Sequence, residues 1–397
     1  NIRVYPYITS YYYSGKKNLP NWTILGHLQR QSLVNQNHPV ANLNTPTMKA
    51  ALYYGQHDIR IEDIPEPEPL AHEIKIRVAW NGICGTDLHE YIDGPILTPK
   101  HGKAHPITKI SLPVVLGHEF SGTIVAVGSN VEGFAIGERV AVDPLIYDNT
   151  CPQCRLGRNN ICEKRGHLGL SSDRGGLAEY CCVEPHNLHK LPANVSLEMG
   201  ALVESLAVGW HAVRESGFQK GQTALVLGAG PIGLSVLLAL EAIGAKTVIV
   251  SEIAELRKTY AQDYGALVLD PTKQDIEAEI KGVTEGLGVD VSYDTSGVQQ
   301  SLDIAIKAIK PGGTAFMIAL WKEPALVDTN ELAVKEKRFM GGMAFNNDDY
   351  PRVIEAIADS RLKPEKMITA RVPLSQLMEK GIQQLIEHKA CNVIYDV

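Results

Sequence analysis

Four side chains of this sequence carry groups that bind transition-metal ions: one thiol, one imidazole and two carboxylates. They are Cys84, the adjacent pair His118 and Glu119, and Glu204. All are good zinc ligands, and a catalytic zinc needs three protein ligands and one open position. Glu204 follows an apolar run at 199–203, where burial is expected, and a buried carboxylate requires a partner such as a cation. Taken singly, the cysteine and the histidine are better explained as ordinary core residues, but together the four predict a zinc site.

A second group of metal-binding residues lies in one short loop. Cys151 and Cys154 are separated by two residues, as in many zinc-binding loops, and Cys162 adds a third thiolate. A closed structural site needs a fourth ligand, which the carboxylate of Asp148 could provide. Two interpretations remain open: the loop holds a structural zinc with Asp148, or it keeps only part of a former ligand set.

The composition limits the classes of function. The chain has 397 residues, of which 44% are apolar and 21% charged, as expected for a globular protein with about two domains. The net charge of -7 argues against a nucleic-acid-binding surface. No apolar run reaches the roughly 18 residues of a membrane-spanning helix, so no membrane partner is expected. The seven cysteines are odd in number and three lie in one loop, which favours metal ligation over disulfides and predicts a reducing, cytoplasmic location.

From residue 221 the sequence alternates between strand-like and helix-like segments. The apolar run 223–227 is typical of a buried parallel strand, and it leads directly into the glycine motif 228–233, Gly-Ala-Gly-Pro-Ile-Gly. A helical stretch follows to Gly244, then a second strand at 247–251, and Glu252 stands 24 positions after the first glycine. A glycine motif between a strand and a helix, with an acid at this distance, predicts a dinucleotide-binding unit.

Each residue type in the glycine motif has a physical reason. The first glycine makes a tight turn, the second lets a pyrophosphate approach the backbone, and the third lets helix and strand pack closely. The helix N-terminus offers N–H groups to the phosphates. Glu252 would accept hydrogen bonds from the adenosine ribose and would repel a 2′-phosphate, so NAD is favoured over NADP. The predicted cofactor-binding residues are Gly228, Gly230, Pro231, Ile232, Gly233, Glu252, Arg257 and Thr295.

The remaining elements are predicted from hydrophobic patterning. Regular structure is expected to begin at 48–53, followed by a strand at 73–79. Short strands bounded by glycine are expected at 122–128 and 137–142, which indicates a small β-barrel-like domain. The alternation at 73–79 predicts a strand buried on one face only. Later strands are expected at 289–294, 314–320, 339–343 and 392–395, with a helix ending near Lys310 and others at 350–360 and 374–388.

Residues 1–47 differ from the rest of the chain. They contain no Asp or Glu, and their basic residues are Arg3, Lys16, Lys17 and Arg30. An acid-free, weakly basic leader could be a mitochondrial transit peptide, although this one is poor in Arg and Ser for that role. We prefer the alternative that it is an upstream extension with Met48 as the natural start, and we leave it outside the fold.

In this order, the motifs resemble the zinc-containing medium-chain alcohol and polyol dehydrogenases over residues 48–397. The resemblance is carried by Gly82-Ile83-Cys84-Gly85-Thr86-Asp87, Gly117-His118-Glu119-x-x-Gly122, the cysteine loop, the glycine motif and Glu252. Within that family the chain is most similar to the (R,R)-2,3-butanediol dehydrogenases, through 84–91, the insert 93–113 and 250–255. Two residues depart from the pattern. Ser205 follows Glu204 where the family usually has proline, which would loosen that turn, and Asp148 replaces the first cysteine of the structural site.

The resemblance implies an α/β protein with a cleft between two domains. Residues 48–205 and 346–397 would form a GroES-like β-barrel catalytic domain, and residues 206–345 a Rossmann NAD-binding domain with a doubly wound parallel sheet. Catalytic zinc would be held by Cys84, His118 and Glu204. Glu119 would be a switchable fourth ligand or a close neighbour of the ligand set.

The activity that the resemblance implies is hydride transfer between NAD(H) and a small secondary alcohol or ketone, with zinc as a Lewis acid. Thr86 and His89 would carry the proton to solvent, because an imidazole titrates near neutral pH. Alternatively, His89 is only a surface histidine. The expected substrates are 2,3-butanediol and acetoin, and the alternatives are sorbitol, xylitol or L-threonine. A homodimer or homotetramer is expected, with 339–343 as the dimer seam.

A function of another class is a zinc-free, NAD(P)H-binding protein without catalysis. The complete set of Cys84, His118 and Glu204 argues against it, and a metal analysis would separate the two hypotheses.

Overall fold

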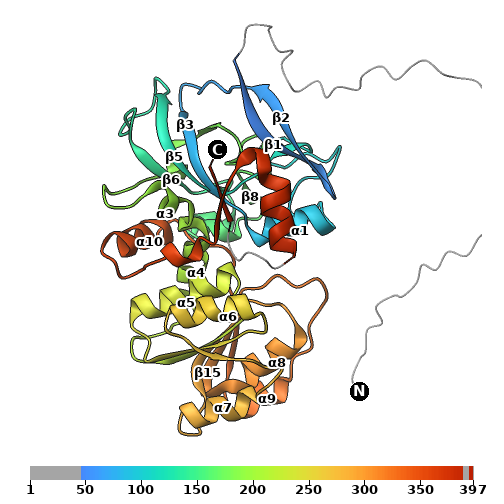
Figure 1. Cartoon of the computed structure of the whole chain (residues 1–397), viewed down its shortest axis with the longest axis vertical. Helices are drawn as coiled ribbons and strands as arrows, with labels where there is room; N and C mark the ends of the chain where they lie inside the picture. The colour runs from blue at the N-terminus through green and yellow to red at the C-terminus, as the bar shows by residue number, and fades with distance from the viewer. Residues whose placement is uncertain (1–45, 388–392, 397) are drawn as a thin grey trace, which may run out of the picture. The chain divides into compact units, whose positions relative to one another are not determined.

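The fold is described for residues 46–387 and 393–396 in a computed structural model (Figure 1). The expectation for residues 1–47 therefore falls almost entirely outside the described residues. Within the described part of the chain, no helix is both long and apolar enough to cross a membrane.

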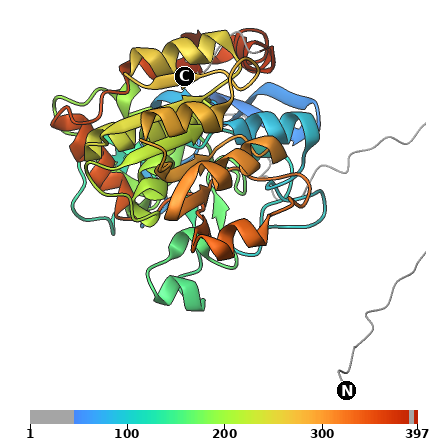
Figure 2. The same ribbon diagram turned by 90° about the horizontal axis from the view of Figure 1, so that it is seen from below.

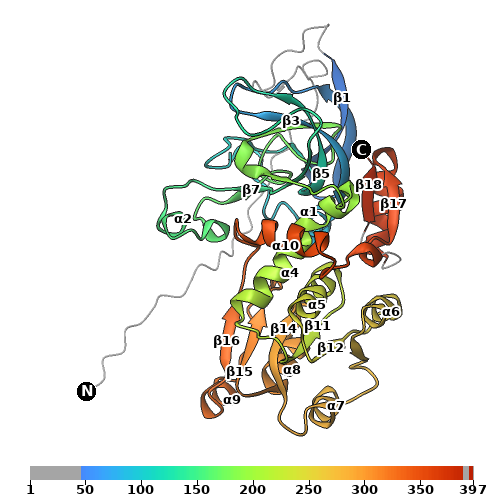
Figure 3. The same cartoon turned by 90° about the vertical axis from the view of Figure 1, so that its left-hand side faces the viewer.

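Two mostly antiparallel sheets form the part of the molecule that contains Glu119, one of the predicted zinc-site residues. The smaller has the order β2 (Asp58–Pro65), β1 (Thr47–Gly55), β4 (Val114–Val115). The larger has the order β10 (Leu188–Lys190), β6 (Arg139–Val142), β5 (Glu119–Val127), β3 (Ile74–Gly82), β18 (Val393–Asp396), β17 (Ala370–Pro373), and β9 (Tyr180–Val183) also pairs with β3. The strands β17 and β18, from the C-terminal end, thus join a sheet built mainly from the first half of the chain (Figure 3).

β3 is more deeply buried than a strand with one solvated face. Ile74, Lys75 and Ile76 are all buried in succession. The Nζ of Lys75 lies 2.6 Å from Glu66 Oε1 and 3.1 Å from Glu68 Oε1. Because a buried ammonium group is tolerated when it is paired, a polar residue of the alternating pattern can point into the protein. The prediction of a half-buried strand was therefore wrong for this stretch, although its position was right.

A six-stranded parallel sheet forms the second half of the molecule. Its order is β13 (Leu267–Leu269), β12 (Thr247–Ser251), β11 (Thr223–Leu227), β14 (Val289–Asp294), β15 (Ile309–Met317), β16 (Arg338–Gly341). Numbered from β11, this is the strand order 3-2-1-4-5-6 of the dinucleotide-binding fold. Successive strands are added outward on one side of β11 and then on the other side, beginning with β14. Ligands of such sheets bind at the carboxyl ends of the strands where the order reverses, here after β11 and β14.

Helices cover both faces of this sheet, as side-chain packing shows. Val226 and Val248 belong to a core shared with α4 (Val203–Glu215) and α5 (Pro231–Ile243). The neighbouring Leu225 and Ile249 pack instead with residues of α7 (Ile276–Val283) and α8 (Gln299–Ala308). Since successive strand residues point to opposite faces, a nearly continuous apolar strand needs two such layers. Figure 2 shows helices on both sides of the sheet.

The other helical segments connect these layers. They are α1 (Gly85–Asp93), α2 (Pro152–Arg155), α3 (Leu197–Ala201), α6 (Glu255–Asp263), α9 (Thr329–Val334), α10 (Asp349–Ala358) and α11 (Gln383–Ile386), with single turns at Asn159–Ile161, Pro185–Asn187, Glu365–Met367 and Leu374–Gln376. The strands β7 (Leu145–Ile146) and β8 (Gly166–His167) pair with each other in a two-stranded sheet. The loop with α2 protrudes from the body of the molecule (Figure 3).

The predicted helix at 374–388 is not a single regular helix. A 3₁₀ turn at Leu374–Gln376 is followed by a π-helical segment at Leu377–Ile382 and then by the short helix α11. Leu374, Leu377, Ile382 and Leu385 are nevertheless buried in one cluster with β1 and β4 residues. The apolar spacing was therefore read correctly, but the backbone winds differently to bury it.

Candidate active site

The first residue of the site, Cys84, stands immediately before α1. Asp87, three residues later, accepts the backbone N–H of Cys84 through Oδ2 at 3.0 Å and so caps the helix. Its other oxygen, Oδ1, lies 3.4 Å from His118 Nδ1. Asp87 is 1% exposed, so this carboxylate links the two predicted ligands inside the protein. A carboxylate on Nδ1 orients the ring and leaves Nε2 for a metal ion.

Glycines make room for the two residues at the start of β5. Gly117 has a φ of +97°, and a Cβ there would lie 2.5 Å from the backbone nitrogen of Leu177. Gly82 stands opposite Glu119 in the β3–β5 ladder, and a Cβ on Gly82 would lie 2.3 Å from Glu119 Oε2. The Glu119 carboxylate thus occupies the space that a side chain at 82 would fill.

Cys84, His118 and Glu119 form a compact donor cluster. One ligand atom from each lies within 4.8 Å of the others. Glu204, in the first turn of α4, is 7% exposed but is not part of this three-residue cluster. Glu119 Oε2 is buried without a hydrogen bond. Because unpartnered buried carboxylate oxygens are costly, these residues fit a bound cation, and the thiol and imidazole among them favour zinc.

The electrostatics of the cluster point to the same ion. Burial, followed by the nearby Glu119 charge, raises the pKa of the Cys84 thiol to about 11. Burial also raises the pKa of Glu119 to about 7, and burial together with Glu119 raises that of Glu204 to about 8. Burial alone would lower the pKa of His118, but Asp87 and Cys84 raise it well above its usual value. A divalent cation would relieve this crowding of acids, because metal ligation favours their deprotonated forms.

The glycine motif forms the predicted turn at the end of β11. Gly228 has a φ of +98°, and a Cβ on Gly233 would lie 2.0 Å from Gly228 O, so both positions require glycine. α5 begins at Pro231 with Gly230 as its N-cap, and no side chain caps this end. Thr295 Oγ1, from the end of β14, donates to Leu227 O at 2.8 Å. The turn thus lies where the strand order reverses and presents a helix N-terminus, as phosphate binding requires.

Glu252 is tied to the glycine turn itself. Its Oε2 accepts the N–H of Ala229 at 2.7 Å, and Oε1 accepts the N–H groups of Ile253 and Ala254 at 2.7 and 2.8 Å. The carboxylate is therefore fixed beside the turn before any ligand arrives. Arg257 approaches the same turn, since a Cβ on Gly230 would lie 4.0 Å from its Nη1.

The cysteine loop brings its four candidate ligands together. Ligand atoms of Asp148, Cys151, Cys154 and Cys162 lie within 4.8 Å of one another. Asp148 Oδ1 accepts the N–H groups of Thr150 and Cys151, both at 2.9 Å, and these bonds hold the pKa of Asp148 well below its usual value. Burial, followed by its cysteine neighbours, raises the pKa of Cys154 to about 12. The donor set fits a four-coordinate zinc, for which an anionic Asp148 is ready.

The predicted proton relay lies along α1. Thr86 Oγ1 is 3.6 Å from Cys84 Sγ. His89 is one helical turn further on the same side of α1, and its side chain is 61% exposed. His89 Nδ1 is 4.0 Å from Asp93 Oδ2, which also pairs with Lys322 of the second half of the chain at 2.6 Å.

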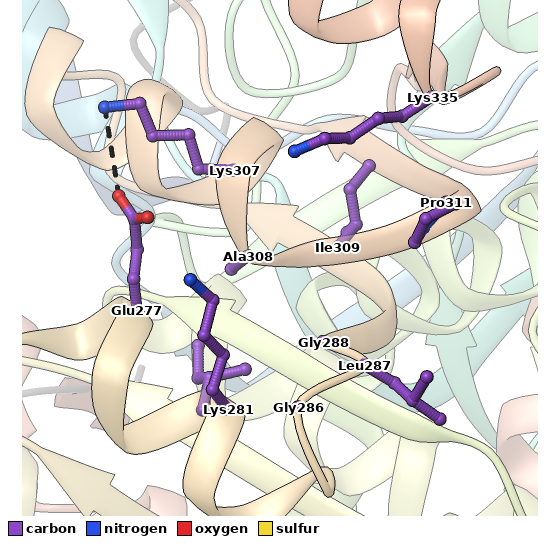
Figure 4. Close-up of a pocket in the computed structure, with 11 residues that line it drawn as sticks. Glu277, Lys281, Gly286, Leu287, Gly288, Lys307, Ala308, Ile309, Pro311 and Lys335 are labelled. Carbon is purple, nitrogen blue, oxygen red and sulfur yellow. Dashed lines mark ion pairs between the residues drawn. The ribbon is translucent and has the colours of Figure 1, made fainter.

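A cavity of about 210 Å³ lies far from this chemistry. Lys281, Lys307 and Lys335 line it, with Glu277 3.8 Å from Lys307, near the amino ends of β14 and β15 (Figure 4). The glycine turn is at the carboxyl ends of the same sheet. This cavity is therefore not part of the candidate active site.

Comparison with known proteins shows the family of this chain. Residues 70–193 match the alcohol dehydrogenase GroES-like domain, and residues 231–359 match the zinc-binding dehydrogenase domain. The chain is a zinc-binding alcohol dehydrogenase. The (R,R)-butanediol dehydrogenase of Bacillus subtilis is 40% identical over 344 residues, which cover 86% of this chain and 97% of that protein. That of Neisseria gonorrhoeae is 39% identical over 343 residues, covering 86% and 96%.

A solved structure agrees with these matches. The crystal structure of 2R,3R-butanediol dehydrogenase from Bacillus subtilis superposes with a TM-score of 0.84 at 39% identity, covering 88% of this dehydrogenase and 99% of that chain. The predicted family resemblance and the predicted fold class are thus confirmed. The boundaries at 205/206 and 345/346, and the role of each ligand, stay predictions.

Two residues of the site were missed by the sequence reasoning. Asp87 was quoted within a motif but given no role, although an acid three residues into a helix is a recognisable capping signal. His167 was not singled out at all, yet its ring centroid lies 6.5 Å from that of His118. Nothing in the local sequence of His167 indicates this proximity, because it arises from the packing of two distant loops.

Proposed function

We propose that this dehydrogenase interconverts (R,R)-2,3-butanediol and acetoin, with NAD(H) as the hydride carrier. The observation that carries the proposal is the buried cluster of Cys84, His118 and Glu119, with Glu204 at its side, in a chain that also has the glycine turn and a fixed Glu252. The substrate is taken from the printed names of the relatives described above. Sorbitol, xylitol or L-threonine would use the same chemistry and are the alternatives.

Each residue has a proposed task. Cys84, His118 and Glu204 hold zinc, and Glu119 serves as an exchangeable fourth ligand. Zinc in this site supplies a Lewis acid that stabilises negative charge developing on the substrate oxygen. Thr86 binds the alcohol proton through its hydroxyl, and His89 passes that proton to water, since its ring is exposed on the same side of α1. Glu252 binds the ribose hydroxyls and disfavours a 2′-phosphate.

The test is NAD⁺-dependent oxidation by the purified protein, with and without a chelator. The panel is (R,R)-2,3-butanediol, meso-2,3-butanediol, sorbitol and L-threonine. Turnover of the butanediols that the chelator abolishes would support the proposal. Chelator-sensitive turnover of sorbitol or threonine alone would keep the chemistry and refute the substrate. A protein without zinc and without turnover would instead be the non-catalytic NAD(P)H-binding protein.

We further propose that the cysteine loop holds a structural zinc through Asp148, Cys151, Cys154 and Cys162. The convergence of the four ligand atoms and the anionic state of Asp148 support this assignment. Lys164, whose Nζ lies 3.2 Å from Asp148 Oδ2, is a competing partner. Metal analysis should find about two zinc ions per chain, and one in Asp148→Ala. Two zinc ions in that variant would exclude Asp148 as a ligand.

We also propose a homodimer formed through β16. This strand is at the edge of the parallel sheet, and Phe339 and Met340 on it are 42% and 36% exposed. An exposed apolar edge strand is a template for pairing with a second copy. Light scattering should show a dimer or tetramer for the wild-type protein and smaller particles for Met340→Lys. An unchanged mass would place the interface elsewhere.

A further inference from the structure

His167 stands beside the residues of the candidate zinc site. Its ring plane is tilted by 57° from that of His118, at a centroid distance of 6.5 Å. The ring makes no hydrogen bond to any residue in the described part of the chain. Other histidines are engaged: His105 Nε2 lies 3.2 Å from Arg165 O, and His211 Nδ1 lies 2.7 Å from Asp349 Oδ2. A neutral imidazole offers one donor and one acceptor, so His167 can still bind a ligand.

The position of His167 is fixed by close backbone packing on one side. Gly169, two residues further on, contacts the loop before His118, and a Cβ there would lie 2.1 Å from Gly117 O. The same carbonyl accepts the N–H of Gly176 at 2.8 Å. The backbone just after His167 therefore packs directly against the backbone just before His118.

The insert 93–113 fixes the other side. A Cβ on Gly166 would lie 2.8 Å from the ring of His105, which belongs to this insert. His105 is 8% exposed and also receives the weak N–H contacts of Ile107 and Thr108 at 3.4 Å. The segment that carries His167 thus lies between the insert and the loop that carries His118.

The chemistry of His167 suits an oxygen ligand. An imidazole offers a nitrogen donor and a nitrogen acceptor, so it can pair with either a hydroxyl or a carbonyl group.

We propose that His167 binds the oxygen adjacent to the reacting oxygen, and thereby makes the site selective for vicinal diols and α-hydroxyketones. This inference rests on the proposed function. The two oxygens of such a substrate sit on neighbouring carbons, so one can occupy the zinc site while the other meets the His167 ring. A simple secondary alcohol leaves the imidazole without a partner, and a site that must leave a polar group unpaired rejects that substrate.

The test compares a diol with a monoalcohol in three variants. His167→Leu removes the polar nitrogens, His167→Gln retains a donor and an acceptor, and His72→Leu changes an exposed histidine as a control. For His167→Leu we expect kcat/KM for (R,R)-2,3-butanediol to fall about 10-fold or more, the effect of losing a well-placed hydrogen bond, with that for 2-butanol nearly unchanged. His167→Gln should restore part of the discrimination.

A second readout does not depend on turnover. Calorimetric binding of acetoin to the NAD⁺-saturated protein should weaken by a similar factor in His167→Leu, and binding of 2-butanone should not. Zinc content and the unfolding midpoint, measured in parallel, confirm that each variant is folded and loaded.

The outcomes separate this inference from the proposed function. Wild-type turnover of the diol with an unchanged diol-to-monoalcohol ratio in His167→Leu refutes the role of His167 and keeps the function. Equal loss for both alcohols assigns His167 a merely structural task and also refutes it. A wild-type protein that oxidises neither alcohol, but binds acetoin in a His167-dependent manner, refutes the function and keeps the recognition. His167-independent binding in that case refutes both.

Discussion

Asp87 offers the sharpest test of how the zinc site is held. It performs two tasks with two oxygens: Oδ2 accepts the Cys84 N–H at 3.0 Å, and Oδ1 lies 3.4 Å from His118 Nδ1. The two tasks predict different consequences for two substitutions. Asp87→Asn keeps an amide oxygen for the Cys84 N–H but removes the negative charge beside His118. Asp87→Ala removes both.

The magnitudes follow from these two contacts. Loss of a carboxylate that orients a ligand histidine typically lowers metal affinity about 10- to 100-fold, or roughly 1.4–2.8 kcal/mol. We expect this loss in both variants. A buried N–H left without an acceptor costs about 1–3 kcal/mol, so Asp87→Ala should also destabilise the zinc-free protein by this amount, because Cys84 N–H loses its partner. Asp87→Asn should leave the zinc-free stability nearly unchanged.

Two assays separate the effects. Competition with a chromophoric chelator measures zinc affinity, and denaturant unfolding of the chelator-stripped protein measures stability without metal. Asp359→Asn is a matched control, because Asp359 is exposed and pairs only with its neighbour Arg361. Wild-type zinc affinity in Asp87→Asn would refute the argument that the charge of Asp87 supports His118. Unchanged zinc-free stability in Asp87→Ala would refute its capping role.

Three further predictions come from other contacts of the site and its supports. Gly82→Ala should displace Glu119, whose Oε2 would lie 2.3 Å from the new Cβ, and should lower kcat/KM at least about 10-fold. Gly85→Ala is the control and should be tolerated, because a Cβ there would meet nothing within 4 Å. Equal activities of the two variants would show that Glu119 can move freely. Glu252→Gln keeps an acceptor for the Ala229 N–H but loses the negative charge. The ratio of kcat/KM with NAD⁺ to kcat/KM with NADP⁺ should therefore fall about 10-fold. An unchanged ratio would assign the discrimination between the two cofactors to another residue. Asp349→Ala should lower the free energy of unfolding by about 3 kcal/mol, because it removes one partner of the buried ion pair with His211. A loss of less than about 1 kcal/mol in a denaturant titration would contradict this prediction.

The pH dependence of Asp349 has a definite sign. Although burial opposes it, the hydrogen bond to His211 and the backbone N–H of Asn346 hold the pKa of Asp349 below its usual value. A carboxyl with a depressed folded-state pKa stabilises the fold above its unfolded pKa, and this stabilisation is lost as the pH falls through the folded value. Wild-type protein should therefore lose stability more steeply below about pH 4 than Asp349→Asn does.

The clustering of Cys84, His118 and Glu119 could be predicted from the sequence because a thiol, an imidazole and a carboxylate are chemically distinctive metal-binding groups. Glu204 is a carboxylate next to an apolar run, and the glycine motif has few explanations outside a strand-to-helix turn. Asp87 is an acid at the third position of a helix, which is part of a common capping pattern. The N-cap of α1 is Cys84 rather than Ser or Thr, so the sequence does not match the usual form of that pattern. Lys75 could not be predicted as buried, because its partners Glu66 and Glu68 act across a turn.

His167 lay beyond any local pattern. It comes near His118 because β8 pairs with β7 and because Gly169 contacts Gly117, which is 52 positions earlier in the chain. Such proximity depends on tertiary packing, and neither spacing nor periodicity reports it. The same holds for the link between Lys322 and Asp93, which joins residues from the two halves of the chain.

The helix α4 explains how the site tolerates the departure at Ser205. Ser205 is in the first turn of α4, where proline is acceptable but not required, and its Oγ donates to Leu202 O at 3.2 Å. Two turns later His211 is held by Asp349 of α10 at 2.7 Å and faces Asn160 of the cysteine loop at 3.4 Å. These contacts hold the backbone of α4, and therefore the backbone position of Glu204, without a proline at position 205.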